Sequence, residues 1–249
     1  LQGFTLVSCF SQNKDELIIE LNNRHRSFFI KISLLPEFQC ISFPDKFHRA
    51  RKNSIDLFNE ILMKRLMRVL VYRNERSIGV TLEDGFELIF KMHGRQGNVL
   101  LVKDGTVVSI FRNNLASDLS LTPGNLHRDI DWTFECFAAH QPTVESLYIT
   151  FGAVLWEYLR QQGFNTSPVH ERWLMIEQLL AQLDNPSYYI VRIKGRLHLV
   201  LVPVGEAVGE FSSPIKAVTE FFFLYQSASG FDRQQALLLS AVHGRMKQA

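Results

Sequence analysis

The sequence predicts an α+β protein, in which a domain of antiparallel strands precedes a mainly helical domain. Up to residue 110, short runs alternate apolar and polar side chains, which is the period of half-buried strands. Asp84-Gly85 and Asp104-Gly105 separate such runs, and Asp-Gly is a preferred two-residue link between antiparallel strands. After residue 135, apolar residues recur every three or four positions, as in helices. The predicted divisions are 1–135, 136–231 and a last helix at 232–249.

In the first domain we expect two sets of strands on either side of an inserted helix. The strands are predicted at 4–10, 16–21, 28–33 and 38–42, and then at 77–82, 86–91, 98–102 and 106–110. Ser54 is a preferred N-cap residue for the helix between them. The apolar stripe of that helix would consist of Ile55, Phe58, Leu62, Leu66 and Val69. Lys64 and Arg68 would lie on its opposite face.

In the second domain, capping residues and turn residues mark the expected elements. Thr143 would cap a helix that ends at Gly163, with Leu147, Phe151, Leu155 and Tyr158 on one face, and Ser167-Pro168 would open another that ends before Pro186. Lys194-Gly195 would join a hairpin of strands 188–193 and 196–202, and Ser213-Pro214 would begin a further helix.

Composition and charge are those of an ordinary globular protein. The chain has 249 residues, of which 46% are hydrophobic and 21% charged, and its net charge of +2 favours no class of partner. Between residues 45 and 76, nine Lys or Arg residues stand against four acids, a local net charge of +5. Such a block is usually a solvated face, but it is also the pattern expected of a phosphate-binding surface.

Cysteine usage and hydropathy bound the environment of the protein. Cys9, Cys40 and Cys136 are widely spaced and contain no C-x-x-C pair, so we expect no disulfide framework, no metal and no cofactor. The cysteine pattern fits a reducing cytoplasm best, and no run approaches the ~18 consecutive apolar residues of a membrane span, so we expect no membrane partner. The chain lacks an initial Met and ends within a predicted helix, so we expect a fragment.

A long motif at residues 86–102, FELIFKMHGRQGNVLLV, resembles the core motif of the NFACT family, the fibronectin-binding-protein-A-like proteins of ribosome-associated quality control. Gly94, Arg95, Asn98 and Leu101 match that core, whereas His93, Gln96 and Gly97 depart from it. Three other stretches resemble family motifs in the right order: 13–20, 57–66 and 121–126. The resemblance therefore covers most of residues 1–130.

The resemblance carries expectations about fold. It implies that the first domain is an NFACT N-terminal domain, similar to formamidopyrimidine-DNA glycosylases. The second domain would be the helical middle domain of the family, and the helix at 232–249 would lead into coiled-coil arms.

The functional signature of the family is an Asp-Arg pair just before the strand that precedes the long motif. The matching positions here are Glu75 and Arg76, so Glu stands where Asp is usual. The resemblance implies that this pair engages tRNA, with the carboxylate aiming a guanidinium that grips phosphate or a base edge. The alternative from the residues alone is a surface ion pair worth at most ~1 kcal/mol.

The glycine turn, which is His93–Gly97 between the strands predicted at 86–91 and 98–102, and the residue after it supply three further candidates for tRNA contact: His93, Arg95 and Asn98. A cation beside exposed backbone N–H groups would form an anion-binding concavity, although the turn could serve only to join two strands. Asn98 could equally bond turn backbone. Candidates to follow an RNA backbone are Lys64, Arg68 and Arg112, for which a plain solvated face is the alternative.

By resemblance, the intact protein binds the large ribosomal subunit carrying obstructed peptidyl-tRNA and recruits tRNA for untemplated C-terminal tailing. The alternative is a cell-surface adhesin that binds fibronectin. An enzyme is not expected, because the sequence has no G-x-S-x-G, no P-loop and no metal-spaced His cluster. Base excision would also need an N-terminal Pro-Glu and a cysteine zinc finger, and both are missing. The sequence does not predict an oligomeric state.

Overall fold

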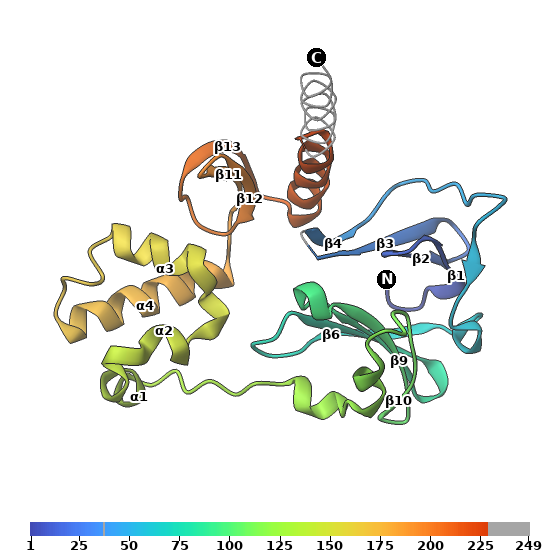
Figure 1. The fold of residues 1–249 in the computed structure, drawn as a ribbon, viewed down its shortest axis with the longest axis horizontal. Helices are drawn as coiled ribbons and strands as arrows, with labels where there is room; N and C mark the ends of the chain where they lie inside the picture. Colours follow the sequence, from blue (N-terminus) through green and yellow to red (C-terminus); the bar gives the residue numbers. More distant parts are fainter. Residues whose placement is uncertain (37, 229–249) are drawn as a thin grey trace, which may run out of the picture. The chain divides into compact units, whose positions relative to one another are not determined.

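A computed structural model describes residues 1–36 and 38–228 of the chain (Figure 1). It confirms the predicted α+β class with antiparallel sheets. The chain divides into two compact units, the first formed by Leu1–Cys136 and the second beginning at Phe137. The helix predicted at 232–249 lies outside the described residues.

The first sheet of the first unit is an antiparallel meander with one short added strand. Its strands are β1 (Thr5–Asn13), β2 (Glu16–Asn22), β3 (Ser27–Leu35), β4 (Phe38–Ser42) and β5 (Ile55–Asp56). They lie in the order β4-β3-β2-β1-β5, so that β4 is an edge strand. The four strands predicted from alternation correspond to β1–β4, whereas β5 was not predicted.

The second sheet is also antiparallel, in the order β10-β9-β8-β7-β6. Its strands are β6 (Leu66–Val71), β7 (Ser77–Leu82), β8 (Phe86–Lys91), β9 (Asn98–Lys103) and β10 (Thr106–Ile110). Asp104 and Gly105 form the predicted two-residue link between β9 and β10, with φ of 50° and 82°, whereas the link between β7 and β8 has three residues, Glu83–Gly85, of which Asp84 and Gly85 have φ of 58° and 72°. Two positive φ values match the right-handed twist of the strands they join, so both predicted hairpins are confirmed.

The core of the first unit lies between the two sheets. Leu6, Leu17 and Ile32 of the first sheet belong to the same buried cluster as Leu88 and Leu101 of the second. The opposite face of the second sheet is buried too, in a cluster formed by Tyr72, Ile89, Leu100, Val102, Val107, Ile110 and Leu126. Strands β8 and β9 are therefore covered on both faces, which explains the unbroken apolar run at residues 99–102.

The helix predicted from Ser54 is wrong. Leu66–Val71 forms β6 and pairs with β7, and the residues before it form only a short 3₁₀ turn at Asn59–Ile61. Positive φ values of 53° at Phe58 and 65° at Met63 are incompatible with a continuous helix. Two interactions stabilise the observed arrangement. The backbone of β6 forms hydrogen bonds with the backbone of β7, and the side chains of Phe58 and Ile61 are buried in the core. The apolar spacing that suggested a helix is divided among these separate segments.

The second unit combines helices with a small sheet. Helix α1 (Phe134–Ala139) spans the boundary between the units, and the other helices are α2 (Val144–Leu147), α3 (Gly152–Gln161), α4 (Val169–Asp184) and a helix at 214–228. Its strands are β11 (Tyr188–Ile193), β12 (Arg196–Val200) and β13 (Glu206–Phe211), in the order β12-β11-β13. Lys194-Gly195 makes the predicted hairpin link, with φ of 48° and 78°. Strand β13 was not predicted.

The single helix predicted from Thr143 to Gly163 is interrupted. Tyr148 leaves helical geometry, and a 3₁₀ turn (Ile149–Phe151) and Gly152 at φ 58° separate α2 from α3. The break changes the helical register, so α3 buries Trp156 and Leu159; of the predicted stripe, Phe151 is buried just before α3, whereas Leu147, Leu155 and Tyr158 are half-buried. Further 3₁₀ turns lie at Glu83–Gly85, Gly94–Gln96, Ala116–Ser120, Pro123–Leu126 and Gln141–Thr143. Within 1–36 and 38–228, no helix has the length and apolar character needed to cross a membrane.

Candidate functional site

The predicted Glu75-Arg76 pair lies in the turn that joins β6 to β7. Asn74 occupies the left-handed region at φ 56°, and the Glu75 N–H donates to Tyr72 O over 3.2 Å, which closes the turn. The Met92 N–H donates to Arg76 O over 2.8 Å. The pair therefore lies beside the segment that follows β8, where the glycine turn begins.

Glu75 is held by two partners that the sequence did not connect to it. One carboxylate oxygen, Oε2, lies 3.1 Å from His93 Nε2, and the other, Oε1, is contacted by Arg128 Nε. Only 12% of the Glu75 side chain is exposed, compared with 54% for Arg128. This carboxylate fixes the turn from within the protein and does not pair with Arg76.

The protonation state of His93 follows from its surroundings. Burial lowers the pKa of His93 below that of a free imidazole, although the Glu75 carboxylate acts in the opposite direction, and Lys91, Arg76 and Arg128 lower it further. His93 is therefore neutral at pH 7, and its contact with Glu75 is a hydrogen bond rather than an ion pair. Ser77 Oγ lies 3.0 Å from the same Nε2.

The lowered pKa of His93 predicts a pH dependence of stability. Below the unfolded pKa of about 6.5, the unfolded chain binds a proton that folded His93 resists, so stability falls as the pH falls. We expect the free energy of unfolding to drop more between about pH 7.5 and pH 5.5 in the natural chain than in His93→Gln. Urea titrations at both pH values measure the difference, since the other histidines are common to both proteins. Equal drops would contradict this assignment.

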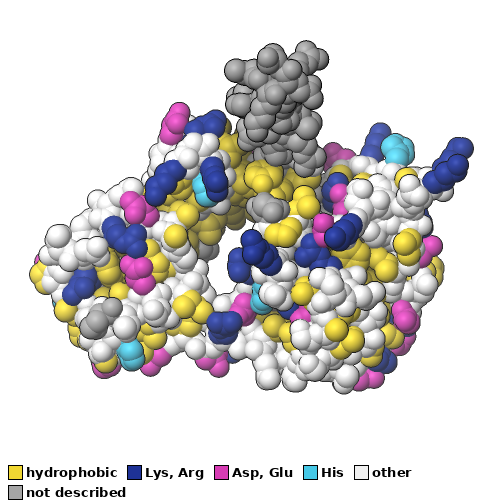
Figure 2. Space-filling model, viewed as in Figure 1, with side chains coloured by type: hydrophobic (Ala, Val, Ile, Leu, Met, Phe, Trp, Pro, Cys, Tyr) yellow, Lys and Arg dark blue, Asp and Glu magenta, His cyan; other side chains and the backbone are white. Residues whose placement is uncertain are grey.

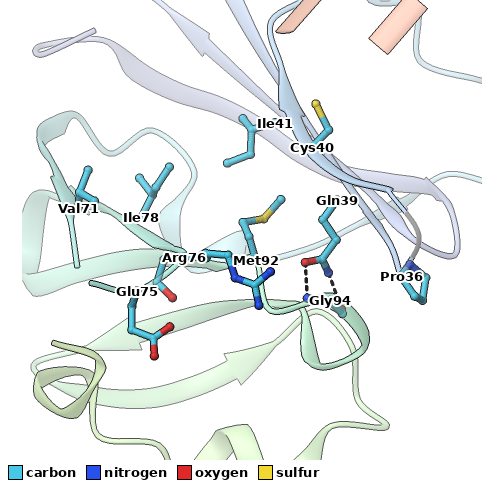
Figure 3. Close-up of a pocket in the computed structure, with 11 residues that line it drawn as sticks. Pro36, Gln39, Cys40, Ile41, Val71, Glu75, Arg76, Ile78, Met92 and Gly94 are labelled. Atoms are coloured by element: carbon cyan, nitrogen blue, oxygen red, sulfur yellow. Dashed lines mark hydrogen bonds between the residues drawn. The ribbon is translucent and has the colours of Figure 1, made fainter. Parts of the chain in front are cut away.

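Arg76 points into a cleft at one edge of the two sheets, with a volume of about 620 Å³. Figure 3 shows its side chain extending toward Met92 while the Glu75 carboxylate turns the other way. The apolar part of the lining comes from Ile41 on β4, Ile78 on β7, Val71 and Met92. Within the described part of the chain, the Arg76 guanidinium has no hydrogen bond or ion pair, and the residue is exposed. Its five N–H donors are available to a ligand.

Cys40 also lines this cleft, from strand β4. Burial raises the pKa of its thiol to about 11, so the thiol is protonated at neutral pH. A protonated thiol is a poor nucleophile. Cys40 therefore contributes surface to the cleft rather than covalent chemistry.

The glycine turn does not form the anion-binding concavity predicted for it. The Gly94 N–H donates to Gln39 Oε1 over 2.6 Å, and Gln39 Nε2 donates to Gly94 O over 2.7 Å. The N–H groups of Gln96 and Gly97 bond His93 O and Gly94 O. Because these groups already have partners, they cannot cradle an anion. Arg95 is exposed on this turn, and its side chain bonds no other described residue.

The close approach of Gln39 explains the glycine at position 97. A Cβ there would overlap the Gln39 side-chain amide and lie 3.0 Å from Gly94 O. We expect Gly97→Ala to destabilise the chain by about 1–3 kcal/mol in urea unfolding. Gly124→Ala is the matched control, because a Cβ at Gly124 would meet nothing within 4 Å. In a double-mutant cycle, Gln39→Ala should remove much of the Gly97→Ala penalty; strict additivity would contradict the predicted overlap.

Asn98 and Arg112 lie inside the first unit rather than at its surface. Asn98 is 0% exposed; its Oδ1 accepts from Val99 and Arg112 N–H groups, and its Nδ2 donates to Asp118 Oδ2 over 2.9 Å. Arg112 links the sheets, because it contacts Asp15, donates to Leu34 O over 2.7 Å and donates to Gly97 O over 3.2 Å. These bonds leave Asn98 no free polar atom, so both residues have structural roles.

Lys64 and Arg68 do not lie on a helix, and they are separated from Arg76. Lys64 pairs with Asp84 over 2.6 Å beside the β7–β8 hairpin, at the other end of β6. Six strand residues rise by ~20 Å, which places Lys64 outside the cleft. Arg68 is exposed in the middle of β6. Of the eight predicted site residues, the structure brings together Glu75, Arg76 and His93, with Arg95 on the turn that follows His93.

Sequence reasoning missed Gln39, Ser77 and Arg128. Gln39 contacts Gly94 across 55 positions of sequence, and Arg128 contacts Glu75 across 53. Neither residue belongs to a family motif, although Gln39 lies in the alternating run predicted as the strand at 38–42. The sequence shows only that Gln39 is a polar residue in a strand and Arg128 a polar residue in a loop. Many other positions have the same character, so neither residue could have been selected.

Comparisons with known proteins find structures of similar fold but do not assign this chain to a family. Neither a family model nor a curated protein sequence matches this chain. The crystal structure of the fibrinogen-binding protein from Staphylococcus aureus is similar over 89% of this chain and 93% of its own, with a TM-score of 0.65 and 9% identity. The N-terminal part of the fibronectin/fibrinogen-binding protein FBPS from Streptococcus suis is similar over 90% and 93%, with a TM-score of 0.50 and 10% identity.

A third solved structure, the N-terminal domain of the fibronectin-binding protein PavA from Streptococcus pneumoniae, covers 89% of this chain and 92% of its own. Its TM-score is 0.43 and its identity is 12%. At sequence identities this low, structural similarity is evidence about the fold alone. The similarity to the Staphylococcus aureus protein supports a β-rich N-terminal region of antiparallel sheets.

Proposed function

We propose that this chain binds RNA through the Arg76 cleft, as part of a factor that recruits tRNA to large ribosomal subunits carrying obstructed peptidyl-tRNA. The observation that carries the proposal is the guanidinium of Arg76, exposed and unpaired among the described residues, at an apolar cleft of about 620 Å³. A guanidinium donates in its plane to phosphate or to a base edge, and apolar walls accept a ribose or a base face.

The surroundings of Arg76 support a directed contact. Glu75 is tied to His93 and Arg128, so the turn that presents Arg76 is held in place. Because its carboxylate contacts His93 and Arg128, Glu75 orients the backbone of the turn and does not orient the Arg76 guanidinium. The resemblance of residues 1–130 to NFACT motifs supports tRNA as the RNA and the large ribosomal subunit as the platform.

Binding of tRNA at two salt concentrations tests the proposal. Fluorescently labelled tRNA is titrated with the chain at about 50 mM and 200 mM salt, where phosphate contacts predict weaker binding at the higher salt. Co-sedimentation with purified large ribosomal subunits at the same two concentrations should follow the same trend. Absence of both interactions would overturn the proposal, as would binding that does not respond to salt.

A second candidate is binding of fibronectin or fibrinogen, the ligands after which the similar Staphylococcus aureus and Streptococcus suis proteins are named. The observation that favours it is the edge strand β6 of the second sheet, whose first residue, Leu66, bonds the backbone of Gly3 and Phe4. There Met67, Val69 and Val71 are 48%, 51% and 67% exposed, and an exposed sheet edge can pair with an extended segment of a protein ligand. Immobilised fibronectin and fibrinogen separate the two functions. Edge binding should be lost in Val69→Pro and retained in Arg76→Ala, whereas RNA binding should show the reverse.

A further inference from the structure

A second cleft, of about 760 Å³, lies within the second unit between α3 and the β11–β12 hairpin. Its helical wall is one face of α3, with Ala153, Glu157 and Arg160 at spacings of three and four. Its other wall includes Arg196 and His198, which are two positions apart on β12 and so share a face of the sheet. The cleft is therefore built by regular elements rather than by a loose loop.

The charged groups of the two walls differ in their bonding. On α3, Arg160 bonds Glu157 over 3.2 Å and Glu145 over 2.8 Å, so these charges are already compensated. On the hairpin, the side chains of Lys194, Arg196 and His198 make no hydrogen bond or ion pair within residues 1–36 and 38–228. Apart from His198, the lining holds three permanent cations, Arg160, Lys194 and Arg196, and one carboxylate, which gives a formal net charge of +2. Figure 2 shows Lys, Arg and His side chains gathered over this hairpin.

An apolar wall and a rigid segment complete the cleft. Val154, Ile193 and Val204 line it beside the cations. Gly205 has φ 81°, and a Cβ there would lie only 2.8 Å from Arg192 O. The segment at Val204 and Gly205 is thus held close against the hairpin backbone, and only glycine allows that approach.

We propose that this cleft binds the phosphate of a nucleotide, either a free nucleotide or one unit of an RNA strand. Its volume is in the range of about 300–1,000 Å³ typical of small-ligand sites. The Arg196 guanidinium and the Lys194 ammonium have no side-chain partner among the described residues, and such groups bind phosphate, while a valine and isoleucine wall accepts the apolar face of a base. A carboxylate peptide would satisfy the cations but would leave the apolar wall uncovered. This site is separate from the Arg76 cleft and does not rest on the function proposed there.

The test uses the 249-residue chain with Arg76→Ala, so that the first cleft does not contribute. Two probes are titrated: AMP, and a fluorescein-labelled single-stranded RNA decamer. Arg196→Gln removes one free cation, and Lys194→Asn removes the other with a residue that tolerates the φ of 48°. Arg192→Gln is the matched control, because Arg192 pairs with Leu197 and so lies on the opposite face of the same hairpin.

We expect Arg196→Gln and Lys194→Asn each to weaken probe binding by about tenfold, and Arg192→Gln to change it less than about twofold. If AMP shows this dependence, the ligand is a free nucleotide; if only the decamer shows it, the ligand is an RNA strand. The proposal is overturned if neither probe binds, or if Arg192→Gln weakens binding as much as Arg196→Gln. Binding of a glutamate decamer as tight as that of RNA, with the same dependence on Arg196, would also overturn it.

Discussion

Replacing Asp118 with alanine is expected to destabilise the first unit by about 3–5 kcal/mol, the largest effect among these variants. Asp118 lies in the 3₁₀ turn Ala116–Ser120 and is 5% exposed. Its Oδ1 contacts Lys91 Nζ, and its Oδ2 accepts from Asn98 Nδ2 over 2.9 Å. Lys91 is only 6% exposed, so the substitution would leave an ammonium ion buried without its counter-charge.

Urea unfolding at pH 7 measures this effect. Asp129→Ala is the control, since Asp129 is 87% exposed, lies 3.6 Å from Arg73 and should contribute little. Combining Lys91→Met with Asp118→Leu should recover most of the lost stability, because a buried ion pair can be replaced by apolar groups of similar volume. If Asp118→Ala were as stable as Asp129→Ala, the buried pair would not have the assigned role.

Replacing Arg76 with alanine is expected to weaken tRNA binding by about tenfold or more, with no loss of stability. Lys64→Ala removes the same charge but should have little effect. Lys64 lies at the other end of β6, pairs with Asp84 over 2.6 Å and lies 5.1 Å from the centre of the Phe86 ring. Arg76 has no such partners among the described residues. Arg76→Lys should recover little of the binding, because an ammonium lacks the planar donor geometry of a guanidinium.

Titration of labelled tRNA with the three variants, at matched melting temperature, checks this expectation. A directed contact predicts that Arg76→Ala loses affinity at every salt concentration and lowers the salt slope by about one. A purely electrostatic role predicts similar losses in Arg76→Ala and Lys64→Ala. Full affinity in Arg76→Ala, or full rescue by lysine, would show that the guanidinium does not contact the RNA.

Local sequence determined most of the β architecture. Residues 77–82, 86–91 and 106–110 form strands with the predicted bounds, because alternation and Asp-Gly links act between neighbours in the chain. The hairpin at Lys194-Gly195 was predictable for the same reason. The family resemblance selected Glu75 and Arg76 and the glycine turn supplied His93, but only the structure brings the three into one site.

Tertiary structure alone decided which of those residues is available to a ligand. The stripe from Ile55 to Val69 fits a helix, but pairing along β7 and burial of Phe58 and Ile61 require separate segments. Asn98 becomes an interior residue because Asp118 and Arg112 close around it. Among the described residues, Arg76 has no side-chain partner, because Glu75 bonds His93 and Arg128 instead. Periodicity and motifs report interactions between near neighbours in sequence, whereas these outcomes depend on contacts between distant segments, which exist only after both sheets have formed.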